Sequence, residues 1–360
     1  MSRKVRILFC NQPSSSFIKR DFEILKKHFD VRIPEFGVTF GVRTFLRQVF
    51  HYVRRFSKNK CTQDFKFPPL DLVRCILWVD LTFSWFAYGS AYSAVILSKL
   101  FRKKSVVVAG GYDVVGVPEI RYGTMLIPKD ARKVKFVLEN ANMILPVSNF
   151  LENEVRKITE KAHIHTIPNA CDIQRFKPSR EEKEDIVLTV CNVNKETVVK
   201  KGLKTFLESA WLLPEIKFIL IGAHMDDSIN YLRNISPSNV QFTGYISEED
   251  LIKWYQRAKV YCQLSYHEGF GVSLIEAMAC QCVPVVSSKA VVLKEVVEEC
   301  GFYVPYGDAK ATANAIEMAL SAPLDLGAKA RKRVKDLFSI EKREKRLLES
   351  ISRVMKSEER

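Results

Sequence analysis

Two glutamates and two glycines lie close together near residue 270. The segment reads, in order, Glu268-Gly269-Phe270-Gly271-Val272 and reaches Glu276 after three more residues. Gly269 and Gly271 let the backbone approach a ligand closely, because glycine carries no side chain. Carboxylates beside such a loop can accept hydrogen bonds from the hydroxyl groups of a sugar or a ribose.

The elements expected around this loop place it well for binding. An apolar strand is predicted at 260–264 and an amphipathic helix at 272–280. The unpaired N–H groups and positive dipole end of the helix N-terminus attract phosphate. A rise of about 1.5 Å per residue keeps Glu268 and Glu276 within the length of a sugar nucleotide. The alternative is an ordinary strand–turn–helix with surface glutamates, which Gly-x-Gly alone would favour.

Short strand-like runs alternate with helical runs along the whole chain. Strands are predicted at 5–10, 31–33, 76–81, 105–109, 143–147 and 164–167, then at 186–193, 217–221, 240–243, 260–264, 283–287 and 302–304. Helices of roughly 10–15 residues between them imply parallel sheets with crossover helices. We therefore expect an α/β protein of two Rossmann-like, doubly wound domains that face a central cleft, with a polar hinge near 168–184.

Composition limits the classes of partner. The chain has 360 residues, 47% of them hydrophobic, and a net charge of +15. This charge suits nucleic acid, an anionic membrane or phosphate-bearing small molecules, but no nucleic-acid-binding motif is present. Nine scattered cysteines without a CxxC pair favour a reducing, cytoplasmic location. The uncharged stretch 81–97 carries too many polar residues for a membrane span and predicts a buried strand followed by a buried helix.

A basic segment at 41–60 has a second informative pattern. Phe45, Val49, Tyr52 and Phe56 recur at helical spacing, with arginines at other positions. Such a helix can lie in an anionic membrane interface, where each basic residue contributes on the order of 1 kcal/mol. The pattern predicts a peripheral protein on the cytoplasmic membrane face, with a lipid-linked or membrane-borne acceptor. The alternative is a helix packed on its own domain with its arginines in solvent.

Three further motifs accompany the glutamate motif in a fixed order. They are Ile144-Leu-Pro-Val-Ser148, Ile167-Pro-Asn-Ala-Cys-Asp172-Ile-Gln-Arg-Phe176-Lys-Pro178 and Gly244-Tyr-Ile-Ser-Glu-Glu-Asp-Leu251. Together the four resemble the motifs of glycosyltransferase family 4, retaining enzymes of the GT-B fold in glycosyltransferase group 1. The resemblance spans about 140–320 and is loose in the N-terminal half.

The resemblance implies a domain plan and an activity. It implies an N-terminal acceptor-binding domain at 1–168, with 340–360 crossing back onto it, and a C-terminal nucleotide-sugar-binding domain at 169–339. It also implies retaining transfer of a hexose from a UDP- or GDP-sugar to a glycan or glycolipid acceptor. Glu268 would hold the sugar hydroxyls and Glu276 the ribose. The alternative is a catalytically inactive scaffold that binds sugar nucleotides or membranes.

The diphosphate contacts follow the family pattern only in part. Lys201-Gly202 matches the family's Lys-Gly pair, but Asn192 stands where an arginine is usual. Lys195 could supply the missing positive charge, or it could be a solvated loop residue. Lys201 and the amides of residues 270–272 are expected to stabilise the diphosphate. No metal or other cofactor is expected, because no Asp-x-Asp follows a strand.

The first half contributes one further candidate. The predicted strand at 105–109 runs into Gly110-Gly111-Tyr112-Asp113. Many members of the resembled family have a histidine here that contacts the donor sugar. Asp113 could replace that histidine as an acceptor for a sugar hydroxyl. The alternative is a turn or N-cap aspartate, since Asp is favoured at both positions.

Overall fold

The computed structural model describes residues 4–34 and 75–357. They form two compact units: unit 1 contains the chain up to Ile167 together with the residues from Glu344 onward, and unit 2 is Pro168–Arg343. The second boundary therefore falls inside helix α15 (Ile340–Lys356), whereas the sequence predicted a boundary between residues 339 and 340. The basic segment 41–60 lies outside the described residues.

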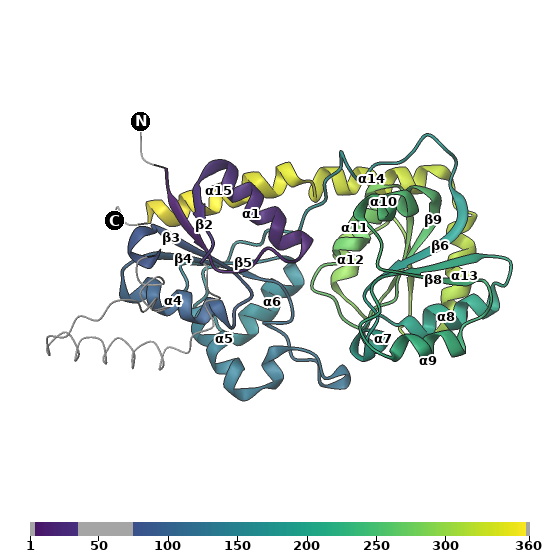
Figure 1. The fold of residues 1–360 in the computed structure, drawn as a ribbon, viewed down its shortest axis with the longest axis horizontal. Coiled ribbons are helices and arrows are strands. Elements are labelled where there is room, and N and C mark those ends of the chain that lie inside the picture. The colour runs from purple at the N-terminus through teal and green to yellow at the C-terminus, as the bar shows by residue number, and fades with distance from the viewer. Residues whose placement is uncertain (1–3, 35–74, 358–360) are drawn as a thin grey trace, which may run out of the picture. The chain divides into compact units, whose positions relative to one another are not determined.

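Unit 1 contains a five-stranded parallel sheet in the order β2-β1-β3-β4-β5. Its strands are β1 (Arg6–Phe9), β2 (Asp30–Arg32), β3 (Leu81–Trp85), β4 (Lys104–Ala109) and β5 (Met143–Pro146). Its helices are α1 (Ser16–His28), α4 (Ser90–Leu100), α5 (Pro128–Asn140) and α6 (Asn149–Ile158), with short 3-10 turns η1 (Pro118–Ile120) and η2 (Thr124–Leu126). Figure 1 shows α4 and α5 on one side of this sheet and α1 and α15 on the other. Glu344 of α15 is tied to α1 by a 2.8 Å ion pair with Lys27.

Two predictions for unit 1 were wrong. Residues 75–78 are helical, and the strand begins only at Leu81. The predicted strand at 164–167 is reduced to a single bridge between Ile164 and Ile144. Both errors have one cause, since a short apolar run does not distinguish a strand from a buried helical turn or an extended loop. Within the described residues, no helix is both long and apolar enough to cross a membrane.

Unit 2 contains a six-stranded parallel sheet in the order β11-β10-β9-β6-β7-β8. Its strands are β6 (Glu184–Val190), β7 (Lys217–Ile221), β8 (Val240–Gly244), β9 (Ala258–Gln263), β10 (Val283–Ser287) and β11 (Phe302–Val304). Its helices are α7 (Lys195–Lys200), α8 (Leu203–Leu212), α9 (Ser228–Ile235), α10 (Glu248–Arg257), α11 (Val272–Ala279), α12 (Val292–Val297), α13 (Ala309–Leu320) and α14 (Leu324–Leu337). Each of the six strands predicted for the second half overlaps one of these strands.

The central strand β9 shows how this sheet is packed. Val260 and Cys262 are buried in a core that also contains Phe206 of α8 and Ile316 of α13. Successive side chains of a strand point to opposite faces, so Tyr261 lies on the other face. There its hydroxyl group donates a hydrogen bond of 3.0 Å to Ser273 of α11. Helices thus cover both faces of β9, which explains why all of its residues except Lys259 are buried.

Candidate functional site

The loop between β9 and α11 connects a buried strand to a helix N-terminus. Gly271, which precedes α11, has φ of +101°, in the left-handed region that disfavours other residues. No side chain caps the first turn of α11. The first N–H groups of a helix have no partner within the helix, so this end of α11 can receive an anion.

Glu268 lies in this loop and forms an ion pair with Lys201. Its Oε1 atom is 2.5 Å from the Lys201 ammonium nitrogen and accepts a hydrogen bond of 2.6 Å from the Ser265 hydroxyl. Both Glu268 and Ser265 are buried, with 8% and 0% of their surface exposed. Within the described part of the chain, Oε2 of Glu268 has no hydrogen-bond partner, so it remains able to accept one from a ligand.

The charges of this site are strongly coupled. Burial alone would raise the pKa of Glu268, but the ammonium groups of Lys201 and Lys200 outweigh burial and hold the pKa at about 2. Burial alone would lower the pKa of Lys201, and the Glu268 carboxylate more than compensates, so the pKa of Lys201 is raised. Both groups are therefore ionised across the physiological pH range. The pair offers a fixed cation beside the N-terminus of α11.

Gly202 permits the close approach of the lysine segment to the loop. Its φ is +62°, and a Cβ atom at this position would lie 2.2 Å from the carbonyl oxygen of Leu264. A 2.8 Å hydrogen bond from the Tyr266 N–H to the Lys200 carbonyl also joins the lysine segment to the loop. The Lys-Gly pair is therefore locked against the segment that follows β9, which brings Lys201 to Glu268 across 67 residues of sequence.

Glu276 lies in the second turn of α11, and only 7% of its surface is exposed. Burial is the main reason why the pKa values of Tyr255 and Tyr261 are raised, and the nearby negative charge of Glu276 adds to that effect. The structure therefore places Glu276 on the helix whose N-terminus no side chain caps, close to two buried tyrosines.

Asn192 lies in the loop after β6, and Lys195 is the first residue of α7, which follows that loop. The Asn192 carboxamide oxygen accepts a hydrogen bond of 3.1 Å from the Ala223 N–H, so Asn192 joins the loops after β6 and β7. Lys195 is exposed at the start of α7 and Lys201 follows the end of that helix. At about 1.5 Å per residue, roughly 9 Å separate their backbones. Within the described residues, Lys195 is thus exposed and stands apart from the Lys201–Glu268 ion pair.

Asp113 is fully buried in unit 1, and backbone groups surround its carboxylate. Its oxygens accept hydrogen bonds from the N–H groups of Ala87 at 2.8 Å, Gly110 at 3.1 Å and Gly111 at 2.8 Å. Burial raises the pKa of Asp113 to about 6, against the opposing effect of these hydrogen bonds. These contacts fit the turn interpretation, because a sugar could reach the carboxylate only if the turn opened. The structure therefore does not support the expected contact between Asp113 and a sugar hydroxyl group.

The sequence did not indicate that Ser265 would contact Glu268. Ser265 precedes Glu268 by three residues, and its hydroxyl shares the Oε1 atom with Lys201. Serine at this distance from an acidic residue is a common turn pattern, so the sequence alone gives no specific signal for this contact.

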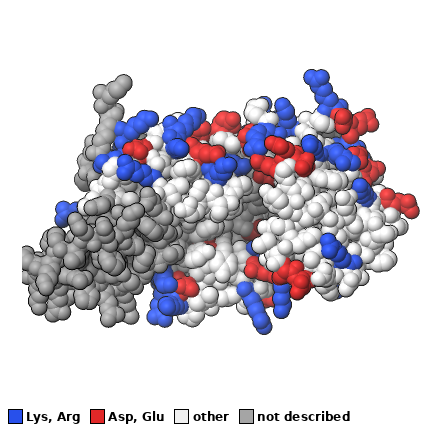
Figure 2. Space-filling model, in the orientation of Figure 1, with Lys and Arg blue, Asp and Glu red and all other residues white. Residues whose placement is uncertain are grey.

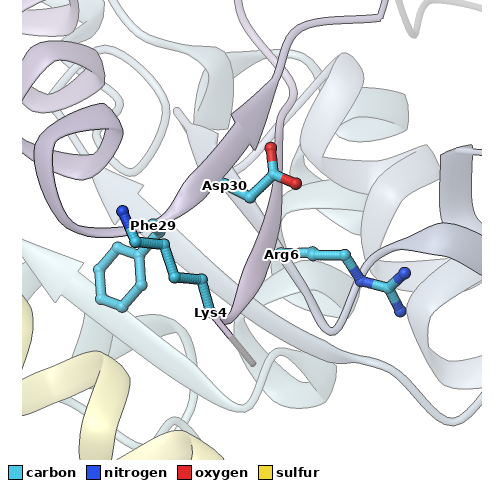
Figure 3. A pocket seen from close by; sticks show the side chains of 4 residues that line it. All are labelled: Lys4, Arg6, Phe29 and Asp30. Atoms are coloured by element: carbon cyan, nitrogen blue, oxygen red, sulfur yellow. The ribbon is translucent and has the colours of Figure 1, made fainter. Parts of the chain in front are cut away.

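The described residues also form hollows elsewhere. One is lined by Lys4, Arg6, Phe29 and Asp30 at the amino ends of β1 and β2. Figure 3 shows the Lys4 amino group beside the Phe29 ring, whereas Arg6 and Asp30 extend to the other side. Ligands of open α/β sheets bind at the carboxyl ends of strands, so this hollow is not a candidate for the active site.

On the face shown in Figure 2, basic residues are interspersed with acidic ones and do not form one block. Helix α14, for example, has ion pairs of Lys329 with Asp325 and of Lys332 with Asp336.

In residues 4–34 and 75–357, no group of three or more His, Cys, Asp or Glu side chains could hold a metal ion.

Comparisons with known proteins point to one family. Residues 171–336, most of unit 2, match the family model described as "Glycosyl transferases group 1". The O-antigen chain mannosyltransferase B of Escherichia coli is 29% identical over 201 residues, 51% of this chain and 52% of that protein. The N,N'-diacetylbacillosaminyl-diphospho-undecaprenol alpha-1,3-N-acetylgalactosaminyltransferase of Campylobacter jejuni is 30% identical over 128 residues, 32% of this chain and 34% of that protein. The match thus spans about half of the first relative and a third of the second.

Solved structures share the fold of this protein over nearly the full chain. Anabaena Alr3699/HepE, solved with UDP and glucose, has a TM-score of 0.75 at 17% identity, covering 97% of this chain and 100% of that one. Sucrose-phosphate synthase of Thermosynechococcus elongatus has a TM-score of 0.76 at 19% identity, covering 99% and 100%. Residues 171–336 thus match the group 1 glycosyltransferase family, and the two parallel sheets together with these structural similarities show that the chain has the GT-B fold.

Proposed function

We propose that this protein is a retaining glycosyltransferase of family 4 that transfers a hexose from a UDP- or GDP-sugar. The observation that carries the proposal is the ion pair, 2.5 Å long, between Lys201 and the buried Glu268, in the loop that leads to the uncapped N-terminus of α11. A fixed cation and a helix N-terminus are together suited to a diphosphate. The Anabaena neighbour solved with UDP and glucose supports a uridine nucleotide as one candidate donor.

The proposed chemistry is substitution at the anomeric carbon of the sugar. Its transition state carries positive charge on the sugar and negative charge on the departing diphosphate. Lys201 and the backbone amides of Phe270, Gly271 and Val272 would stabilise that diphosphate before and during bond cleavage. We assign the neutralisation of the diphosphate to these groups and propose that no divalent metal is required.

The two glutamates receive separate roles in this proposal. Oε1 of Glu268 is held by Lys201 and Ser265, so Oε2 is the oxygen assigned to the sugar hydroxyls. Glu276, in the second turn of α11, is assigned to the ribose. Retention of anomeric configuration would follow from attack on the face that the diphosphate leaves, with the leaving phosphate accepting the proton of the acceptor hydroxyl.

We further propose that the acceptor is a lipid-linked or membrane-associated glycan bound by unit 1. The Campylobacter relative is named for a diphospho-undecaprenol-linked sugar, and another relative is named alpha-galactosylglucosyldiacylglycerol synthase. A peripheral position on the cytoplasmic membrane face, through the segment 41–60, suits such an acceptor. Vesicles of anionic lipid should therefore bind the full chain, and replacing Arg43, Arg47, Arg54 and Arg55 with glutamine should weaken that binding.

A catalytically inactive binding protein is the second candidate, because Asn192 replaces the usual arginine. Incubating the purified chain with radiolabelled UDP- and GDP-sugars, with membrane lipid extract and with EDTA, distinguishes the two. We expect transfer or slow hydrolysis of one donor, unaffected by EDTA, and an NMR spectrum showing the donor's anomeric configuration in the product. Donor binding without transfer or hydrolysis would favour the inactive protein, and inversion would contradict the retaining mechanism.

A further inference from the structure

Three tyrosine rings form a cluster at the carboxyl edge of the unit 1 sheet. Tyr88 lies in the loop after β3, and Tyr112 and Tyr122 lie in the loop after β4. The ring centroids of Tyr88 and Tyr112 are 6.0 Å apart, and those of Tyr112 and Tyr122 are 5.1 Å apart. We call these residues the tyrosine cluster. It lies at the edge where ligands of open parallel sheets bind.

The tyrosine cluster is only partly covered by the described chain. Tyr112 is 36% exposed and Tyr88 is half-buried, whereas Tyr122 forms the floor with 9% exposure. Within the described residues, the hydroxyl groups of Tyr88 and Tyr112 make no hydrogen bond. The cluster therefore presents aromatic surface together with two hydroxyl groups able to donate and accept hydrogen bonds.

The loops that carry these rings are fixed by backbone contacts. Asp113 accepts N–H bonds from Ala87, beside Tyr88, and from Gly110 and Gly111, beside Tyr112. The Tyr112 carbonyl accepts a 2.8 Å hydrogen bond from the Thr124 N–H. A buried carboxylate thus joins the two ring-bearing loops and sets the distance between their tyrosines.

Two further features show that this arrangement is closely constrained. Gly123 has φ of +109°, and a Cβ atom there would lie 2.1 Å from the Val115 carbonyl oxygen. Phe86, whose ring lies 6.2 Å from that of Tyr88, has φ of +66°. Such a conformation is costly for a bulky residue and is found mainly where the surrounding structure imposes it, often at functional sites. A long connection that is ordered in this way is commonly functional.

The chemistry of the tyrosine cluster fits a sugar ring. The face of an aromatic ring carries partial negative charge, and the C–H face of a pyranose carries partial positive charge, so the two pack together. The tyrosine hydroxyls can reach the polar rim of the same sugar. An acyl chain could make only apolar contacts, so the hydroxyl groups of Tyr88 and Tyr112 would lack a hydrogen-bond partner.

We propose that the tyrosine cluster binds one pyranose ring of the glycan acceptor, and that Asp113 is the positioning residue that holds the cluster together. The inference rests on the glycosyl transfer proposed above, and it adds to that proposal the place and the chemistry of acceptor recognition. Tyr112, as the most exposed ring, makes the largest contact.

The test is binding of sugars in the absence of any nucleotide. The full chain is mixed with α-1,3-mannobiose, N,N'-diacetylchitobiose or lactose, and saturation-transfer NMR measures contact. We expect signal from the C–H face of at least one disaccharide. Tyr112→Ala should weaken that binding by about tenfold, and Tyr112→Phe should keep most of it.

The control variant is Tyr231→Ala, which removes a tyrosine of comparable exposure from α9 in unit 2, and it should bind like the wild type. Thermal unfolding verifies that each variant is folded. No signal from any of the three disaccharides, or equal signal from Tyr112→Ala, would overturn the proposal. No donor is present in this experiment, so its results do not test the proposed glycosyl transfer. A chain that binds the disaccharide but transfers no sugar would refute only the proposed glycosyl transfer.

Discussion

Glu268 in unit 2 and Asp113 in unit 1 are buried carboxylates in glycine-containing loops that follow parallel strands. Burial alone would raise the pKa of both, but only Glu268 has ammonium groups beside it, and these groups hold its pKa at about 2. Asp113 accepts only backbone N–H groups, and its pKa is about 6. The same residue class in the same kind of loop therefore serves two purposes. In our proposal the carboxylate paired with a cation belongs to the donor site, whereas the carboxylate surrounded by amides joins two loops.

The largest expected effect comes from removing the cation of the pair. Lys201→Met leaves the Glu268 charge buried without its partner, which typically costs 3–5 kcal/mol of stability. We expect Glu268 to take up a proton near neutral pH in this variant, and donor turnover to fall by about 100- to 1000-fold. The matched control is Lys204→Met, because Lys204 is exposed on α8 and pairs with Glu208 at the surface. Urea unfolding and donor hydrolysis measure the two effects, and equal behaviour of the two variants would contradict the comparison.

A second prediction concerns the glycine that brings the pair together. The Cβ atom of Gly202→Ala would meet the Leu264 carbonyl at 2.2 Å. We expect a loss of about 4 kcal/mol, combining left-handed strain with overpacking, and a weaker Lys201–Glu268 contact. Gly307→Ala is the control, since its φ of +84° is also left-handed but no atom lies within 4 Å of the added Cβ. If both variants lost the same stability in urea, the steric argument would fail.

The two carboxylates should give opposite pH dependences of stability. Asp113 has a folded pKa above its ordinary value, so its contribution to the unfolding free energy falls by up to about 3 kcal/mol as pH rises from 4 to 6. Glu268 has a folded pKa below its ordinary value, so its contribution, also about 3 kcal/mol, is present above pH 4.5 and lost as pH falls toward 2. Unfolding in urea across this range should show a fall between pH 4 and 6 that Asp113→Asn removes. The same slope in the variant would show that Asp113 is not the group responsible.

A smaller effect is expected at Glu276, where a substitution tests whether the two glutamates have separate roles. Glu276→Ala removes the group assigned to the ribose and leaves the Lys201–Glu268 pair in place. We expect nucleotide binding to weaken by about tenfold, equivalent to the 1.4 kcal/mol of one hydrogen bond to a charged group, with little change in turnover at saturating donor. Calorimetry with UDP and GDP measures the change. Wild-type affinity for both nucleotides would refute the assignment to the ribose.

Much of unit 2 could be predicted from the sequence. The alternation of β9 and α11 with glycines between them predicted a strand, a loop and a helix N-terminus, and the Lys-Gly pair predicted Lys201 near that loop. The strand, loop and helix are local, so short-range pattern carries them, whereas the position of Lys201, 67 residues from Glu268, followed from the resemblance of the Lys-Gly pair to the family motif. The role of Ser265 depends on a tertiary contact that many turn sequences could make. Asp113 could not be assigned, because its partner Ala87 lies on a different loop and only the fold brings their atoms within 2.8 Å.

The central claim is that Lys201, together with α11, binds the diphosphate of the donor. Dissociation constants of UDP, UMP, GDP and GMP for the wild type and Lys201→Met test it most directly. We predict that the wild type binds one diphosphate at least about tenfold more tightly than its monophosphate, and that Lys201→Met loses this preference while Lys204→Met retains it. A folded Lys201→Met variant that keeps the full preference for the diphosphate would contradict the account.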